Sequence, residues 1–250
     1  MNLYAYGLSD EITAAALAFE EGAGIEGAKP FLIECGGIRA IVSEFGGERV
    51  EVTRANLRAH NRVNGLVLAE TTPLPFRFGT VATAAGLVQY VEANREMLLA
   101  TLERMRGCVE MSVKIMWDVE AMRRASEITD ETLPPTAAVE GAVGPGAAYL
   151  AAKRREMAAS EALKSKAEEI VAWLARGVGD AACETRTEVE PERELVVRVA
   201  HLVERVRLDV YRERLQAARE ERAGELRFLT SGAWPPYSFS NIASQKPKFA

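Results

Sequence analysis

Residues 109–117 carry the pattern that most limits how this chain can fold. Two sets of side chains alternate strictly through it: Val109, Met111, Val113, Ile115 and Trp117 against Glu110, Ser112, Lys114 and Met116. Successive side chains of a β-strand point to opposite faces, so the pattern predicts a strand with one buried and one largely solvated face. Such a strand belongs in an antiparallel or mixed sheet, which favours an α+β fold class.

The elements expected after this strand predict the topology of the second half. A long helix over residues 147–176, ending at Gly177, and a second helix over 204–222 follow from composition and apolar spacing. Three further strands are expected, at 181–189, 195–202 and 225–230. Two right-handed strand–helix–strand crossovers in this order give a four-stranded antiparallel sheet backed by two helices, the ferredoxin-like βαββαβ arrangement.

The edges of that predicted sheet are the strands at 181–189 and 225–230, and exposed edges invite pairing with other chains. Outward-facing Glu184, Arg186 and Glu188 are expected to protect the first edge. The last strand has only Glu225 and Arg227 to protect it.

The first half predicts a smaller α+β unit. Its expected elements are a strand at 3–6, a helix at 11–21, a hairpin at 31–42 turning at Gly36-Gly37, a helix at 53–70, and one helix whose apolar stripe runs from Leu87 to Met105. We therefore expect an N-terminal α+β domain at 1–106 and a ferredoxin-like domain at 107–232, with a short helix and an insertion at 118–146. An extended C-terminal tail at 233–250 completes the chain.

His60 and Asn64 lie on the apolar face of the predicted 53–70 helix, together with Leu57 and Val67. Two interpretations stay open for this pair. The two side chains are acid–base groups, or they are core polar groups that have found hydrogen-bond partners, as buried polar groups usually do.

Charge and motif content exclude several classes of function. The net charge of −5 and the pI near 5.4 give no broad basic field, so we expect no nucleic-acid partner. No secretory signal and no apolar run of membrane-spanning length is present, so we expect a cytoplasmic protein without a membrane partner. With two histidines, three dispersed cysteines, and no nucleophile–base motif or phosphate loop, we expect no metal, cofactor or catalytic residues, and no enzyme.

The run Thr72–Val81 is the least ordinary stretch of the chain. Its two prolines force an extended backbone, two phenylalanines then flank an arginine, and a glycine permits a sharp exit. The run is either a linker that staples two helices to a sheet or a surface for a partner. The candidate interaction or domain-docking residues here are Pro73, Pro75, Phe76, Arg77, Phe78 and Gly79.

The tail contains a second such run, Trp234, Pro235, Pro236 and Tyr237. We expect these residues either to cover the final strand and the first domain or to be released to a partner. The alternative is a tail that packs only as core, since aromatic side chains dominate burial wherever they lie.

Several stretches together resemble the gas vesicle protein F/L family. They are Tyr4-Ala-Tyr-Gly7, Thr72-Pro-Leu-Pro-Phe-Arg-Phe-Gly-Thr80, Gly107-Cys-Val-Glu-Met-Ser-Val-Lys114, Gly144-Pro-Gly-Ala-Ala-Tyr-Leu150 and Ser231-Gly-Ala-Trp-Pro-Pro-Tyr-Ser-Phe239. They follow the family order over almost the whole chain. Ala148 and Ala151 depart from the family pattern, which leaves the F-type or L-type assignment open.

The resemblance implies a minor gas vesicle protein with two α+β domains, the second a modified ferredoxin-like fold. It further implies a non-catalytic assembly or nucleation factor, located in the cytoplasm and at the gas vesicle. Its expected partners are the small hydrophobic shell subunit, whose aggregation it would limit, and other gas vesicle accessory proteins. The alternative is a small-molecule-binding regulatory module, since ferredoxin-like sheets support many functions.

Overall fold

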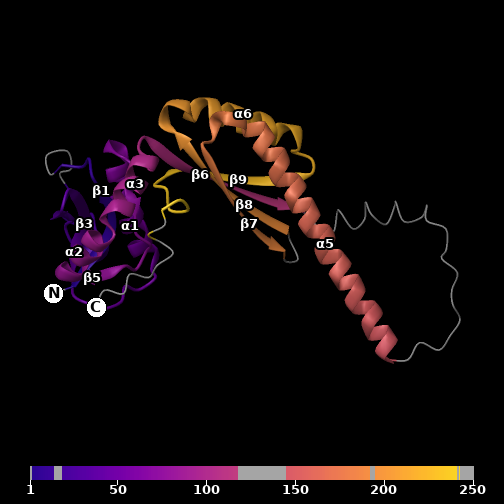
Figure 1. Cartoon of the computed structure of the whole chain (residues 1–250), viewed down its shortest axis with the longest axis horizontal. Coiled ribbons are helices and arrows are strands. Elements are labelled where there is room, and N and C mark those ends of the chain that lie inside the picture. The colour runs from indigo at the N-terminus through magenta and orange to yellow at the C-terminus, as the bar shows by residue number, and fades with distance from the viewer. Residues whose placement is uncertain (1, 14–18, 118–144, 192–194, 241, 243–250) are drawn as a thin grey trace, which may run out of the picture. The chain divides into compact units, whose positions relative to one another are not determined.

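The computed structural model describes residues 2–13, 19–117, 145–191, 195–240 and 242 (Figure 1). The chain divides into two compact units. Unit 1 comprises Met1–Met111, His201–Leu208 and Ser231–Ala250, and unit 2 comprises Ser112–Ala200 and Asp209–Thr230. The domain limits expected at 106/107 and 232/233 stay a prediction, and residues 118–144 of the expected insertion lie outside the described residues.

An antiparallel five-stranded sheet forms the centre of unit 1. Its strands are β1 (Asn2–Ser9), β2 (Phe31–Cys35), β3 (Ile38–Phe45), β4 (Leu74–Pro75) and β5 (Val81–Thr83). The order is β2-β3-β1-β4, and β5 also pairs with β1. The predicted β2–β3 hairpin is confirmed, since Gly36 and Gly37 adopt the positive φ angles of 62° and 92° that a tight hairpin turn requires.

The helices of unit 1 are α1 (Arg54–Glu70), α2 (Ala84–Ala93) and α3 (Arg95–Met105), with a 3₁₀ turn η1 (Ile25–Gly27). The α1 helix begins as predicted, because the side chain of Thr53 accepts a hydrogen bond from the Asn56 amide at 3.1 Å. Its apolar face joins the strands in one core that includes Tyr4, Tyr6 and Val63.

The apolar stripe from Leu87 to Met105 belongs to two helices, and the prediction of one helix was wrong. The break falls at Asn94, which has φ −114° and ψ 13°, outside the helical region. Its side-chain nitrogen donates to the Tyr90 carbonyl at 2.8 Å, and Arg95 donates to the Gly36 carbonyl at 3.0 Å. These contacts close α2 and attach the start of α3 to the hairpin, which apolar spacing alone does not reveal.

The predicted helix at 11–21 is absent from the residues of it that the structure describes, 11–13 and 19–21. Ser9 Oγ accepts from the amides of Glu11 and Ile12, at 3.3 and 3.2 Å, contacts that also occur at helix starts, yet residues 11–13 are not helical. The carbonyl of Ile12 accepts from Arg39 at 2.6 Å. The described residues 11–13 are therefore non-helical and are held to β3 by this tertiary hydrogen bond.

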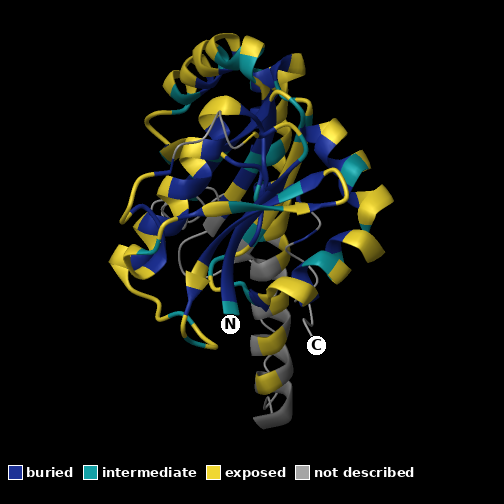
Figure 2. Ribbon diagram, turned by 90° about the vertical axis from the view of Figure 1, so that its left-hand side faces the viewer, coloured by how far each residue is buried: buried dark blue, intermediate teal, exposed yellow. Residues whose placement is uncertain are grey.

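Unit 2 is built on a four-stranded sheet, with α5 and α6 on one of its faces (Figure 1). The strands are β6 (Cys108–Trp117), β7 (Glu184–Pro191), β8 (Leu195–Glu204) and β9 (Leu226–Trp234). The helices are α5 (Pro145–Val178) and α6 (Leu208–Glu221). Two short 3₁₀ turns, η2 (Gly179–Ala181) and η3 (Arg205–Arg207), follow α5 and precede α6. The sheet order is β7-β8-β6-β9. The α+β fold class is confirmed, and the element order and strand order match the predicted βαββαβ arrangement. Figure 2 shows buried residues concentrated on the strands and exposed residues on the outer faces of the helices.

The α5 helix passes Gly177, where the sequence predicts its end, and stops at Val178. Gly177 serves packing, since a Cβ at this position would lie 3.0 Å from the Ala218 Cβ of α6. Gly179, with φ 58°, takes the left-handed conformation that ends the helix. Arg214 of α6 then donates to the Val178 carbonyl at 3.0 Å and to Asp180 at 2.7 Å, which satisfies this helix end.

Candidate interaction site

The Pro73–Gly79 run is partly core and partly surface. Pro73, Pro75 and Phe76 are buried, whereas Arg77 and Gly79 are exposed and Phe78 is half-buried. The buried part adds to the sheet: Pro75 pairs with Gly7, and the Phe76 amide donates to the Tyr6 carbonyl at 2.8 Å. The prolines keep the backbone extended for this pairing. The stapling role is thus present in the structure, and Arg77, Phe78 and Gly79 are what remains for a partner.

Gly79 makes the turn that directs the chain from β4 toward β5. Its φ is 87°, a value that side chains other than glycine rarely adopt. Its amide donates to the Tyr4 hydroxyl at 3.2 Å. The Thr80 hydroxyl donates to the Arg77 carbonyl at 2.7 Å, which holds the tip of the turn. The Arg77 side chain therefore projects from a backbone that is fixed on both sides.

The tail residues also divide between core and surface. Pro235 and Pro236 are buried, Tyr237 is half-buried, and Trp234 is 39% exposed. Beyond them, Phe239 is fully buried and its carbonyl accepts from Arg104 of α3 at 3.2 Å. The tail is therefore packed into unit 1 as far as the described residues extend.

A buried carboxylate on β6 fixes the middle of this tail. Both oxygens of Glu110 are used: one accepts from the Ser238 amide at 2.7 Å and the other from the Ser238 hydroxyl at 2.8 Å. Glu110 is buried, so its assignment to the solvated face of the 109–117 strand was wrong. These two hydrogen bonds satisfy both oxygens of the carboxyl group and so offset the cost of burying it.

The two named stretches meet at His60, the middle of an aromatic cluster that we call the His60 cluster. The cluster consists of Tyr4, Tyr6, His60, Phe78 and Tyr237, whose rings contact one another with centroid separations of 4.8–6.3 Å. The Tyr4 hydroxyl lies 2.8 Å from His60 Nδ1, and the Tyr237 hydroxyl lies 3.0 Å from His60 Nε2. Residues far apart in the sequence thus converge on one imidazole of α1.

Burial sets the protonation of the His60 cluster. Removal from water lowers the pKa of His60 to about 4 and raises the pKa values of Tyr4, Tyr6 and Tyr237 above their usual range. All four groups are therefore neutral at pH 7. Asn64 completes the environment by donating to the Tyr237 hydroxyl at 3.1 Å, while its own Oδ1 has no hydrogen-bond partner among the described residues.

The geometry favours a structural role for His60 over acid–base chemistry. Both of its ring nitrogens already contact tyrosine hydroxyls, and its side chain is only 2% exposed. A general base needs a free nitrogen within reach of a substrate and a pKa near the working pH. The interpretation as satisfied core polar groups therefore fits His60, and the half-buried Phe78 and Tyr237 form the part of the cluster nearest to solvent.

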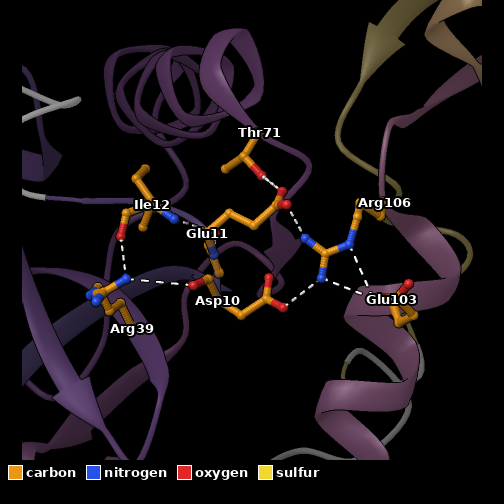
Figure 3. Close-up of polar contacts among 8 residues, drawn as sticks. Asp10, Glu11, Ile12, Arg39, Thr71, Glu103 and Arg106 are labelled. Carbon is orange, nitrogen blue, oxygen red and sulfur yellow. Dashed lines mark hydrogen bonds and ion pairs between the residues drawn. The ribbon is translucent and has the colours of Figure 1, made fainter.

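An ion-pair network holds the segment after β1 against α3 within unit 1 (Figure 3). Arg106 Nη2 lies 2.8 Å from Asp10 Oδ2 and 3.0 Å from Glu103 Oε2, and Arg106 Nη1 pairs with Glu11. The Thr71 hydroxyl donates to Glu11 Oε2 at 2.6 Å. Thr71 and Arg106 together keep the pKa of Glu11 below its usual value. The network joins the ends of β1, α1 and α3, the elements that carry the His60 cluster and the tail contact.

Arg106→Ala is expected to lower the free energy of unfolding of unit 1 by about 1–2 kcal/mol, because several charge-assisted hydrogen bonds are lost together. The loss should shrink in 1 M NaCl, since the pairs are partly exposed and salt screens them. Arg212→Ala is the control, because its single pair with Asp209 is well exposed and should contribute less than about 0.5 kcal/mol. Urea titrations at low and high salt measure both variants, and equal losses would refute the network.

Sequence reasoning missed Glu110, Arg104 and the network around Arg106. The alternating sequence pattern of a strand is the same whether its glutamate is solvated or hydrogen-bonded to a distant tail. No local signal identifies a partner that lies 128 residues away, as Ser238 does from Glu110.

No group of histidine, cysteine, aspartate and glutamate side chains among the described residues is arranged to hold a metal ion. Within the same residues, none of the helices combines the length and the apolar character that a bilayer crossing requires.

Comparison with known proteins identifies the family. The model of the family described as gas vesicle synthesis protein GvpL/GvpF matches residues 2–241. The chain belongs to the GvpL/GvpF family. Among similar proteins, gas vesicle protein L2 of Halobacterium salinarum is 23% identical over 99% of this chain and 94% of its own length. Gas vesicle protein F1 of the same organism is 25% identical over 96% of this chain and 93% of its own.

A solved structure agrees with this GvpL/GvpF membership at the level of the fold. The crystal structure of the gas vesicle protein GvpF from Anabaena sp. PCC7120 superposes with a TM-score of 0.78, at 21% identity, over 97% of both chains. The resemblance expected from the sequence motifs is confirmed. Membership places the chain among proteins of gas vesicle synthesis, and similarity to both F and L proteins leaves its subtype open.

Proposed function

We propose that this GvpL/GvpF chain is a non-catalytic assembly factor that binds the small hydrophobic shell subunit of the gas vesicle. Binding limits the aggregation of that subunit before it is incorporated, in the cytoplasm and at the growing vesicle. The family match over residues 2–241 is the observation that carries the proposal. A subunit that assembles through strands and apolar faces is an aggregation hazard while it is free, so a dedicated binder has a physical purpose.

The candidate site supports binding over chemistry. His60 has both nitrogens engaged and is neutral at pH 7, and the tyrosines around it have raised pKa values. The surface beside it includes the exposed Arg77 and the half-buried Phe78, which are consecutive in the chain. Aromatic and arginine side chains on a rigid backbone are the residue types that dominate protein–protein contacts. Other gas vesicle accessory proteins are further partners that this surface could serve.

Arg77→Ala separates partner binding from folding. Arg77 is exposed, so its loss is expected to change the free energy of unfolding by less than about 0.5 kcal/mol. If the Arg77–Phe78 surface contacts the partner, the same variant should reduce capture of the shell subunit by about fivefold or more, the effect of losing about 1 kcal/mol of binding. Unchanged capture together with unchanged stability would remove Arg77 from the site.

The experiment that tests the proposed function is co-expression of the tagged chain with the shell subunit, followed by capture under native conditions. We expect the shell subunit in the captured fraction and more of it in the soluble lysate. Arg58→Glu, an exposed change on α1, is the control for nonspecific charge effects. A chain that captures no shell subunit, whether alone or with other accessory proteins present, would refute the proposal.

A further inference from the structure

The two outer strands of the unit 2 sheet differ in how well they are protected. Among the described strands the order is β7-β8-β6-β9, so β7 and β9 each have one side without a partner strand. Along β7, Glu184, Arg186 and Glu188 alternate, and the strand ends on Pro191. Charged residues and proline are the devices that stop an edge strand from pairing with another chain. The β7 edge is therefore closed to strand addition.

The β9 edge has fewer of those devices. Arg227 is the one charged residue of the strand sequence LRFLTSGAW, and no proline interrupts it. Leu229 is 57% exposed, and it is followed by the exposed, uncharged Thr230. An open strand with an exposed leucine at its middle presents main-chain donors and acceptors together with apolar surface, the combination that strand addition uses.

A hollow lies beside the first half of this edge, within unit 2. It measures about 360 Å³ and is lined by the end of α6 and the start of β9: Gln216, Arg219, Glu220, Ala223, Leu226, Arg227 and Phe228. Two arginines and one glutamate give this lining a net positive charge. The hollow therefore suits a side chain that carries a carboxylate.

These features select one kind of occupant. A strand that adds to β9 satisfies the free main-chain groups, covers Leu229 with an apolar side chain, and directs an acidic side chain toward Arg227 and Arg219. A second copy of β9 would satisfy the main-chain groups and cover Leu229, but it would supply no acidic side chain, because its sequence contains no aspartate or glutamate. Charge complementarity thus favours a different chain over self-pairing.

We propose that the β9 edge is a docking site for an extended, apolar strand of a partner that carries an acidic side chain near one end. We identify this partner strand as part of the shell subunit, and that identification rests on the proposed function. Docking by strand addition would hold an aggregation-prone strand in a hydrogen-bonded state that a second shell subunit is unable to share.

Leu229→Lys tests the edge directly. The leucine is exposed, so the fold should survive, and a lysine at this position is a known way to block strand addition. We expect capture of the co-expressed shell subunit to fall about tenfold or more. The matched control is Thr187→Lys, which places the same side chain on the exposed β7 edge and should leave capture within about twofold of the unchanged chain.

Arg227→Glu tests the charge of the hollow independently of the strand edge, because it leaves the edge open but reverses the charge beside the hollow. We expect it to reduce capture, whereas Arg58→Glu on α1 should not. Hydrogen exchange of the captured complex should show slower exchange at the amides of 227–230 than in the free chain. Circular dichroism confirms that each variant is folded.

The outcomes separate the edge from the function. The β9 proposal is overturned if Leu229→Lys captures as much shell subunit as the unchanged chain does and the amides of 227–230 do not exchange more slowly in the complex. The proposed function stands in that case. Absence of capture by the unchanged chain overturns both. A free chain that is dimeric in solution, and that Leu229→Lys converts to a monomer, would assign the edge to a second copy and also overturn the proposal.

Discussion

Phe239→Ala is expected to lower the free energy of unfolding of unit 1 by about 3–5 kcal/mol, the usual cost of removing a fully buried phenylalanine. The ring is fully buried, and the same residue accepts from Arg104 through its carbonyl. The change leaves a cavity at the point where the tail enters the core. It also frees the neighbouring Tyr237 and Ser238 to leave their contacts with His60 and Glu110.

A urea titration followed by circular dichroism measures this loss, and hydrogen exchange at α1 amides assigns it to unit 1. Phe31→Ala is the matched control, because Phe31 lies on the outer strand β2 of the same unit and is 38% exposed. Phe31→Ala should lower the free energy of unfolding by about 1 kcal/mol. A loss below about 1 kcal/mol for Phe239→Ala would show that the tail adds little to the core of unit 1, and that its release to a partner is cheap.

The stability of the chain is expected to fall steeply between pH 6.5 and pH 4, because two buried histidines resist protonation. Burial lowers the pKa values of both His60 and His201 to about 4. About one pH unit above 6.5, both residues are neutral in the folded and unfolded states, so their contribution is fully present. As the pH falls toward 4, the unfolded chain binds protons that the folded chain does not, and each histidine removes up to about 1.4 kcal/mol per pH unit.

His60→Gln isolates one of these contributions. The variant should be less stable at pH 7, but its stability should fall between pH 6.5 and 5 with about half the slope of the unchanged chain. The groups that contact the His60 ring do not titrate in this range; they are Tyr4, Tyr6, Tyr237, Asn64 and Phe78. Urea titrations at closely spaced pH values give the slope. A slope unaffected by the substitution would mean that His60 is protonated in the folded chain.

The parts of the fold that the sequence predicts are those fixed by local pattern. Gly36-Gly37 between two apolar strands dictates a hairpin, and Thr53 before an apolar-periodic segment dictates the start of α1. The alternation in β6 and the order of the later elements lead to the strand order β7-β8-β6-β9. Each of these depends on neighbours within a few residues or on chain topology rules, so no distant contact is needed.

The errors arise where distant contacts decide. Arg39 binds the Ile12 carbonyl from 27 residues away, and Arg95, at the break between α2 and α3, binds the Gly36 carbonyl from 59 residues away. Glu110 is buried only because Ser238 comes to it from the tail. Local propensity is a weak prior, and tertiary hydrogen bonds of this kind override it.

The candidate site was only half accessible to sequence reasoning. Both unusual stretches were identified from their prolines and aromatic residues, and the histidine on α1 was singled out separately. The sequence does not show that all three meet, because Tyr237 and His60 are 177 positions apart. The distinction between buried Phe76 and exposed Arg77 likewise depends on the pairing of β4 with β1, which is visible only in the folded chain.

We propose that this chain holds the free shell subunit and prevents it from aggregating, without turning over a substrate. Diluting denatured shell subunit into buffer, while recording light scattering, tests that claim most directly. We expect scattering to fall as the chain is added and to reach a minimum at a fixed molar ratio, while the same amounts of serum albumin have no effect. Scattering that is equal with the chain and with albumin at every ratio would contradict it.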